Sequence, residues 1–177
     1  MINVYENVLE EHVALGIHEL IKNVSWKYDY PSNTSKPDRH WHVLCGEDGE
    51  LFFDFDWVDS IWKAANHKFN FLENYGVQKF RRAYMNAHDY GSEPQMHVDD
   101  GDFTMIYYPR TDWKLEWGGG TLIVENGVNH LVDYKPNSLV VFDANLMHSA
   151  QVVSKSCHEL RTVVVFKCFK CNKGVVV

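Results

Sequence analysis

The second half of the chain is a series of short apolar segments separated by turn-forming residues, and this pattern limits the possible folds. Pro109 stops one segment, and Asn126-Gly127 follows another as a hairpin signal. Strands this closely spaced indicate an all-β sandwich or barrel rather than alternating βα units. We therefore expect a mainly β protein with flanking helices, built on a cupin-like jelly roll. The expected strands include 103–108, 121–125, 138–142 and 161–166.

Helical patterns occur only in the first part of the chain. Residues 5–23 carry apolar side chains at three- and four-residue spacing, which predicts an amphipathic helix. A second helix is predicted from Asp54 or Asp56 to about Tyr75, before Gly76. After this glycine the side chains alternate between apolar and polar, which predicts a strand.

Residues 25–50 follow no period and combine aromatic residues with Ser, Asn, Thr and Pro, which predicts a long loop with some extended structure. Two interpretations remain open: a substrate-facing flap, or a surface loop held by aromatic anchors. His40 and His42 have no accompanying carboxylate motif, so we interpret them as solvated loop histidines. We interpret residues 1–177 as one domain, with a helical and loop buttress over 1–76 and a jelly-roll catalytic core over 77–170.

Composition excludes several classes of partner. The net charge of −7, without a Lys/Arg block, argues against nucleic-acid binding. No run of about 18 apolar residues predicts a membrane span, and the first residues lack the pattern of a signal peptide. We therefore expect a cytoplasmic protein with no membrane partner. Cys168 and Cys171 have CxxC spacing but no second ligand pair, so we interpret them as ordinary thiols.

A candidate metal site centres on His97 and Asp99. On an extended strand, residues two apart project from the same face, so this imidazole and carboxylate would point into one space. His148 is the candidate third ligand because it follows the apolar strand at 138–142 after a short turn. Two histidines and one carboxylate form the facial triad of non-haem Fe(II) oxygenases, which leaves coordination positions open. The remaining histidines of this half lie in connector, turn or polar loop segments: His88, His130 and His158.

Arg161 begins the strongly apolar segment at 161–166. A buried guanidinium without a counter-ion is costly, and its planar geometry suits a carboxylate. A dicarboxylate cosubstrate would supply that anion. The alternative is an arginine at the rim of the sheet, paired with Glu159 or Asp133.

These motifs together resemble the iron- and 2-oxoglutarate-dependent dioxygenases, most closely the prolyl 4-hydroxylase branch. The resemblance covers about residues 80–169 and includes His97-Val-Asp99, a strand ending in Tyr107-Tyr108, Gly118-Gly-Gly-Thr121, His148 and Arg161. It implies a double-stranded β-helix, in agreement with the strand pattern.

The resemblance also implies roles for individual residues. His97, Asp99 and His148 would bind Fe(II), and Arg161 would bind the distal carboxylate of 2-oxoglutarate. Two tyrosines would contribute to the same cavity: Tyr108 by a hydrogen bond to that carboxylate, and Tyr84 by lining the cosubstrate or substrate pocket. Val165 stands where some members have an inward threonine, so no role is assigned to it.

The implied reaction is hydroxylation of an unactivated C–H bond with O2, releasing succinate and CO2. A prolyl residue in a peptide is the substrate that the family favours, and ascorbate is a further expected reductant. Two departures from the family pattern predict altered loops: a long connector from Tyr84 to His97, and the position of Arg161 thirteen residues after His148. The alternative function is a non-catalytic module or sensor that binds metal or 2-oxoglutarate. A zinc-dependent cupin is a third option, which has no need of Arg161.

Overall fold

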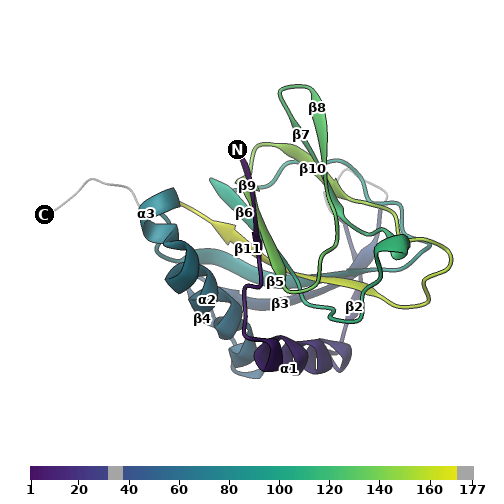
Figure 1. The fold of residues 1–177 in the computed structure, drawn as a ribbon, viewed down its shortest axis with the longest axis horizontal. Helices are drawn as coiled ribbons and strands as arrows, with labels where there is room; N and C mark the ends of the chain where they lie inside the picture. Colours follow the sequence, from purple (N-terminus) through teal and green to yellow (C-terminus); the bar gives the residue numbers. More distant parts are fainter. Residues whose placement is uncertain (32–37, 171–177) are drawn as a thin grey trace, which may run out of the picture.

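The computed structural model describes residues 1–31 and 38–170, which form two antiparallel β-sheets with three helices against one of them (Figure 1). In the larger sheet the strand order is β1-β9-β6-β11-β5-β3-β2, with β4 paired to β3. The smaller sheet has the order β10-β7-β8. Two facing antiparallel sheets agree with the expected jelly roll.

The elements follow the chain in this order. The N-terminal part contains β1 (Ile2–Glu6), α1 (Glu11–Lys22), β2 (Lys27–Tyr30), β3 (His40–Glu47), β4 (Glu50–Leu51), a 3-10 segment η1 (Phe53–Val58), α2 (Asp59–Phe69) and α3 (Phe71–Tyr75). The C-terminal part contains β5 (Phe80–His88), β6 (Phe103–Tyr108), a 3-10 turn η2 (Leu115–Trp117), β7 (Thr121–Glu125), β8 (Val128–Val132), β9 (Ser138–Asp143), β10 (Met147–Ala150) and β11 (Arg161–Cys168).

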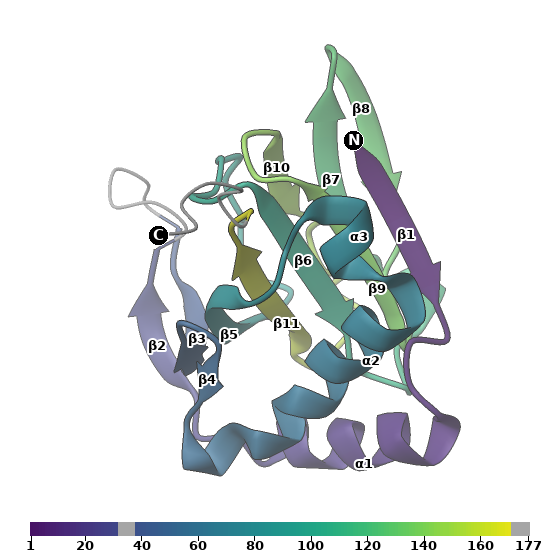
Figure 2. The ribbon, with the colours of Figure 1, turned by 90° about the vertical axis from the view of Figure 1, so that its left-hand side faces the viewer.

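The two faces of the larger sheet bury different clusters of side chains. On β11, Val164 and Phe166 point to the helices, where they join a core with residues of α2 and α3. Val163 and Val165 point to the opposite face and pack with residues of the smaller sheet such as Ile123. Figure 2 shows α2 and α3 lying across the first of these faces. The helices therefore support one face of the sheet, and the other face is free to line a site between the sheets.

The N-terminal region contributes strands to the larger sheet, so the expectation of a helical and loop buttress was incomplete. The helix predicted from residue 5 begins at Glu11, and the residues before it form β1, which pairs with β9. Asn7 adopts a left-handed conformation between the two elements. Asn137 then fixes the chain, since its carbonyl accepts from the Val8 N–H and its side chain from the Leu9 N–H. These partners are distant in sequence, and local periodicity does not reveal them.

Two other N-terminal predictions were wrong in detail. The loop predicted over 25–50 contains β2, β3 and β4, and β3 pairs with β5 along its length. The single helix predicted up to Tyr75 is divided into α2 and α3 by Asn70, whose left-handed conformation stops the first of them. Every helix among the described residues is too short or too polar to cross a bilayer. Cys168 is buried with its thiol on Met105 Sδ, and Cys171 lies outside the described residues.

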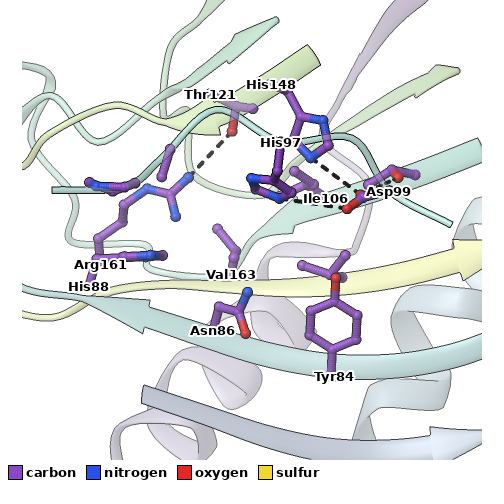
Figure 3. Close-up of a pocket in the computed structure, with 14 residues that line it drawn as sticks. Tyr84, Asn86, His88, His97, Asp99, Ile106, Thr121, His148, Arg161 and Val163 are labelled. Carbon is purple, nitrogen blue, oxygen red and sulfur yellow. Dashed lines mark hydrogen bonds and ion pairs between the residues drawn. The ribbon is translucent and has the colours of Figure 1, made fainter. Parts of the chain in front are cut away.

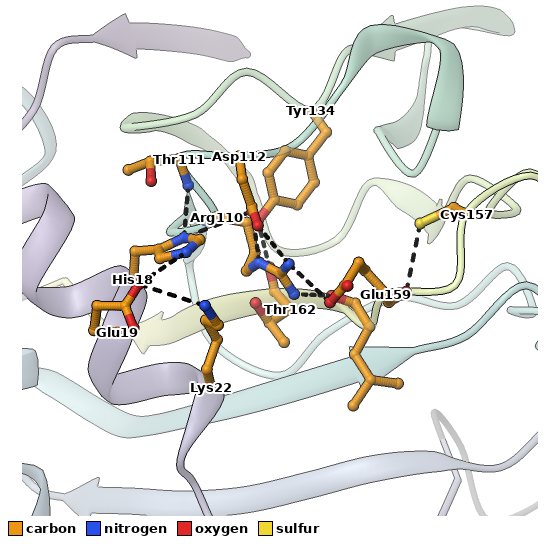
Figure 4. Close-up of polar contacts among 11 residues, drawn as sticks. His18, Glu19, Lys22, Arg110, Thr111, Asp112, Tyr134, Cys157, Glu159 and Thr162 are labelled. Atoms are coloured by element: carbon orange, nitrogen blue, oxygen red, sulfur yellow. Dashed lines mark hydrogen bonds and ion pairs between the residues drawn. The ribbon is translucent and has the colours of Figure 1, made fainter.

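A buried arginine, Arg110, ties the segment before β11 to the loop after β6 (Figure 4). Its guanidinium donates to both carboxylate oxygens of Asp112 at 2.8 and 2.9 Å, to Glu159 at 3.0 Å, and to the carbonyl of Leu160 at 3.2 Å. Burial opposes the charge, but these carboxylates raise the pKa of Arg110. Leu160 directly precedes Arg161, the first residue of β11, so this hydrogen bond lets Arg110 anchor the start of the strand.

Replacing Arg110 with methionine is expected to destabilise the fold by about 2 kcal/mol, because it removes four charge-assisted or carbonyl hydrogen bonds but leaves carboxylates that water can reach. The matched control is Arg81→Met, whose pair with Asp48 lies on the surface and should contribute less than about 1 kcal/mol. Urea unfolding followed by circular dichroism measures both. Equal small losses would show that the Arg110 contacts do not stabilise the fold.

Candidate metal centre and adjoining cavities

Backbone hydrogen bonds bring the predicted ligands together from distant parts of the chain. The N–H of His97 donates to the carbonyl of His148 at 2.9 Å, and the N–H of His148 donates back to His97 at 2.8 Å. The N–H of Asp99 donates to Ala144, in the turn between β9 and β10, at 2.9 Å. One potential ligand atom from each of His97, Asp99 and His148 lies within 4.8 Å of the others. The predicted triad therefore converges, although His97 and Asp99 lie in a connector rather than on a named strand.

Both histidines are oriented to offer their Nε2 atoms. The Nδ1 of His97 is 2.9 Å from the carbonyl of Gln95, and the Nδ1 of His148 is 2.9 Å from that of Leu146. A carbonyl can only accept, so each Nδ1 carries the proton and each Nε2 keeps its lone pair. Burial and the neighbouring His148 lower the pKa of His97, which favours the neutral ring. This donor set fits a divalent transition metal, with the Nε2 atoms 3.6 Å (His97) and 3.3 Å (His148) from Asp99.

Asp99 is held by two side chains that the sequence analysis did not identify. Thr104 on β6 donates to its Oδ2 at 2.6 Å, and the buried ammonium of Lys167 on β11 forms an ion pair with the same oxygen. Although burial opposes ionisation, the contacts with His148 and Lys167 hold the pKa of Asp99 well below its usual range. Asp99 is therefore a carboxylate with one oxygen already hydrogen-bonded, as expected of a metal ligand with a supporting outer layer of residues.

A narrow cavity of about 50 Å³ extends from the triad to Arg161 (Figure 3). Its walls are side chains at every second position of two paired strands, because alternate residues share one face of a sheet. On β5 these residues are Tyr84, Asn86 and His88, and on β11 they are Arg161, Val163 and Val165.

Arg161 closes the inner end of this cavity and is only 2% exposed. Its guanidinium donates to the carbonyls of Gly119 and Gly120 and to Thr121 Oγ1. Among residues 1–31 and 38–170, no carboxylate lies within ion-pair distance of it. The alternative of a rim arginine is wrong, since Arg161 is buried and Glu159 binds Arg110 instead.

The two tyrosines predicted from the family resemblance occupy different positions. Tyr84 lines the cavity between the triad and Arg161. Tyr108 is wholly buried behind Thr121, to whose hydroxyl it donates at 2.7 Å. Thr121 Oγ1 accepts from both Tyr108 and Arg161, so its own proton is free to be donated into the cavity. Thr121, rather than Tyr108, thus borders the space beside the guanidinium.

A larger cavity of about 400 Å³ lies on the other side of His97 and Asp99. Tyr30, His40 and His42, from the region predicted as a loop, form one wall of it. His42 stacks on Tyr30 with ring centroids 3.9 Å apart. Burial and the neighbouring His42 lower the pKa of His40 to about 4, so this ring is neutral near pH 7. The prediction that these histidines are solvated was therefore wrong, because they lie on a strand that faces the site.

Comparison with solved structures shows extensive likeness of fold. A prolyl hydroxylase from Trichoplax adhaerens, in complex with a hypoxia inducible factor oxygen degradation domain peptide fragment, has a TM-score of 0.67 at 14% identity over 96% of this chain and 83% of that one. An oxidoreductase of the 2OG-Fe(II) oxygenase family from Burkholderia pseudomallei has a TM-score of 0.72 at 13% identity over 97% and 86%.

A third similar structure is HygX from Streptomyces hygroscopicus with nickel, 2-oxoglutarate and hygromycin B bound, with a TM-score of 0.66 at 8% identity over 97% and 83%. No family model matches the chain, and no curated protein matches it in sequence. The likeness confirms the jelly-roll fold that the sequence predicted, and the resemblance to 2OG-Fe(II) oxygenases holds for the fold.

Proposed function

We propose that this chain is an Fe(II)- and 2-oxoglutarate-dependent dioxygenase that hydroxylates an unactivated C–H bond, consumes O2 and releases succinate and CO2. One observation carries the proposal. The same narrow cavity has the His97, Asp99 and His148 donor set at one end and the buried guanidinium of Arg161 at the other, and no carboxylate in the described part of the chain pairs with that guanidinium. A metal and a dicarboxylate together satisfy both ends, and neither one alone does.

The residues of the chain have distinct tasks in this reaction. His97, Asp99 and His148 would hold Fe(II) through two imidazoles and one carboxylate. Arg161 and the Thr121 hydroxyl bind the distal carboxylate, and the apolar Val163 and Ile106 keep the cavity poor in water. Iron, the 2-oxoacid and O2 supply the oxidising chemistry when bound, and the protein supplies position and electrostatics.

The outer cavity is the proposed substrate site, because it shares the walls Tyr84, Asn86, His97 and Asp99 with the inner one. Its volume of about 400 Å³ suits a single side chain or a small molecule. A prolyl residue in a peptide is the first substrate class to test, since one structural neighbour is a prolyl hydroxylase with a bound peptide. A polar small molecule is the second, since another neighbour holds hygromycin B. Ascorbate is included as reductant.

The test is to load the protein with Fe(II) and 2-oxoglutarate without oxygen, admit O2, and measure succinate with and without a panel of peptides and small molecules. The proposal predicts O2-dependent succinate that requires Fe(II) and rises with the correct substrate. Binding of metal and 2-oxoglutarate without any turnover, uncoupled or coupled, would favour the non-catalytic module. Activity with Zn²⁺ that does not need 2-oxoglutarate would favour the zinc enzyme.

A further inference from the structure

Lys167 lies on the same face of β11 as Arg161, at the opposite end of the strand. Alternate residues of that strand line the two cavities: Arg161, Val163 and Val165 the inner one, and Lys167 the outer one. Lys167 is only 3% exposed. One strand therefore places a buried cation at each end of the site, and a buried lysine is rare unless it is paired.

The partner of Lys167 is Asp99, the carboxylate of the candidate triad. The ammonium pairs with Oδ2, which also accepts from Thr104 at 2.6 Å. The same oxygen is 3.3 Å from Nε2 of His148, and the other carboxylate oxygen, Oδ1, is 3.6 Å from Nε2 of His97. The neighbouring acid Asp100 forms an ion pair with Arg82 at 2.5 Å, and Asp99 is the carboxylate that contacts Lys167.

We propose that Lys167 is a built-in counter-cation that holds Oδ2 of Asp99 and lowers the affinity of the site for divalent metals. This inference rests on the metal site of the proposed function. The carboxylate of Asp99 and the ammonium of Lys167 sum to zero charge, so a divalent ion brings the pair to +2. Without the ammonium the same ion would bring the carboxylate from −1 to +1, which is a smaller electrostatic cost in a poorly solvated site.

Two variants separate the charge of Lys167 from its hydrogen bond. Lys167→Gln keeps an N–H donor for Oδ2 and removes the charge, whereas Lys167→Met removes both. Titration of the full chain with Mn²⁺, followed by calorimetry or by the electron paramagnetic resonance of free Mn²⁺, should show binding at least about 10-fold tighter in both variants, since a unit charge has been removed a few ångströms from the metal.

Thermal unfolding gives a second measurement that does not depend on turnover. With chelator present, Lys167→Met should melt below the wild type, because Asp99 is then buried without its counter-charge. Added Mn²⁺ should raise its melting temperature by more than it raises that of the wild type. If the methionine variant does not fold, the glutamine variant decides the question by its Mn²⁺ affinity.

The outcomes distinguish failure of the inference from failure of the proposed function. Wild-type binding that is abolished by His148→Ala, together with unchanged or weaker binding in the lysine variants, would overturn the role of Lys167 alone. No His148-dependent Mn²⁺ binding in any of these proteins would overturn the metal site, and the role of Lys167 with it.

Discussion

Replacing Arg161 with methionine is expected to reduce the affinity for 2-oxoglutarate by at least about 100-fold, while Mn²⁺ affinity at the triad changes by less than about threefold. Methionine fills much of the same buried volume but offers no donor. Hydrogen bonds between charged groups contribute about 1.5–3 kcal/mol each, and truncating one partner of a buried charged pair costs about 2–5 kcal/mol. A loss of 100-fold corresponds to about 2.7 kcal/mol, at the lower part of that range.

Calorimetry on Mn²⁺-loaded protein under argon measures the effect of Arg161→Met without turnover. The conservative variant Arg161→Lys keeps the charge and loses the planar pair of donors, so it should lie between the wild type and methionine. Arg110→Met is the matched control for losing a buried arginine, because Arg110 is also buried but is already paired with Asp112 and Glu159. Equal loss of metal and 2-oxoglutarate in Arg161→Met would assign Arg161 a structural role instead.

The β-rich half could be predicted from sequence because its signals are local. Each strand is marked by a few neighbouring residues, such as Pro109, the Asn126-Gly127 turn and the apolar run ending at Phe142. The structure contains the corresponding strands. His148 was a candidate ligand because it follows that apolar strand, and the family resemblance joined it to His97; the backbone bonds between the two residues are visible only in the structure. Metal binding by these three residues stays a prediction.

The strands of the N-terminal region were missed for a physical reason that concerns the site itself. β3 turns His40, His42 and Leu44 toward the outer cavity, so its inner face is largely polar. The first four residues of β3 do alternate between polar and apolar, but Leu44 and Cys45 break the pattern, and the Pro, Asp and Gly residues around the segment favour a loop. β1 was not predicted because this strand forms by pairing with β9, which lies more than a hundred residues away in the sequence. The helix prediction near Tyr75 failed at Asn70, whose left-handed conformation is common for asparagine but not specified by it.

Lys167 and Thr121 are candidate site residues that the sequence signals only in part. Every second residue of a strand lies on the same face. From Arg161 this spacing leads to Val165 and then to Lys167, which therefore share its face of β11. The prior against a buried lysine outweighs this signal unless its carboxylate partner is known. Thr121 begins β7 directly after three glycines, and only the packing of Tyr108 behind it shows which hydroxyl faces the cavity.

Replacing Asp99 with asparagine is expected to abolish measurable Mn²⁺ binding and also to destabilise the protein by about 3–5 kcal/mol, the range found when one partner of a buried ion pair is removed. The amide has nearly the same shape as the carboxylate, so loss of packing contributes little. The cost arises because the ammonium of Lys167, 3% exposed, is left without an anion. For a chain of this length, a loss of that size lowers the melting temperature by roughly 10 °C.

The double variant Asp99→Asn/Lys167→Met should recover most of this stability and none of the metal binding. Removing both charges leaves an uncharged site, and such replacements of buried ion pairs are often neutral. Thermal unfolding with chelator present gives the coupling between the two positions, as the difference between the double variant and the sum of the single ones. A coupling near zero would mean that Lys167 finds another anion or water when Asp99 is lost. A large coupling would mean that one carboxylate both neutralises Lys167 in the fold and binds the metal.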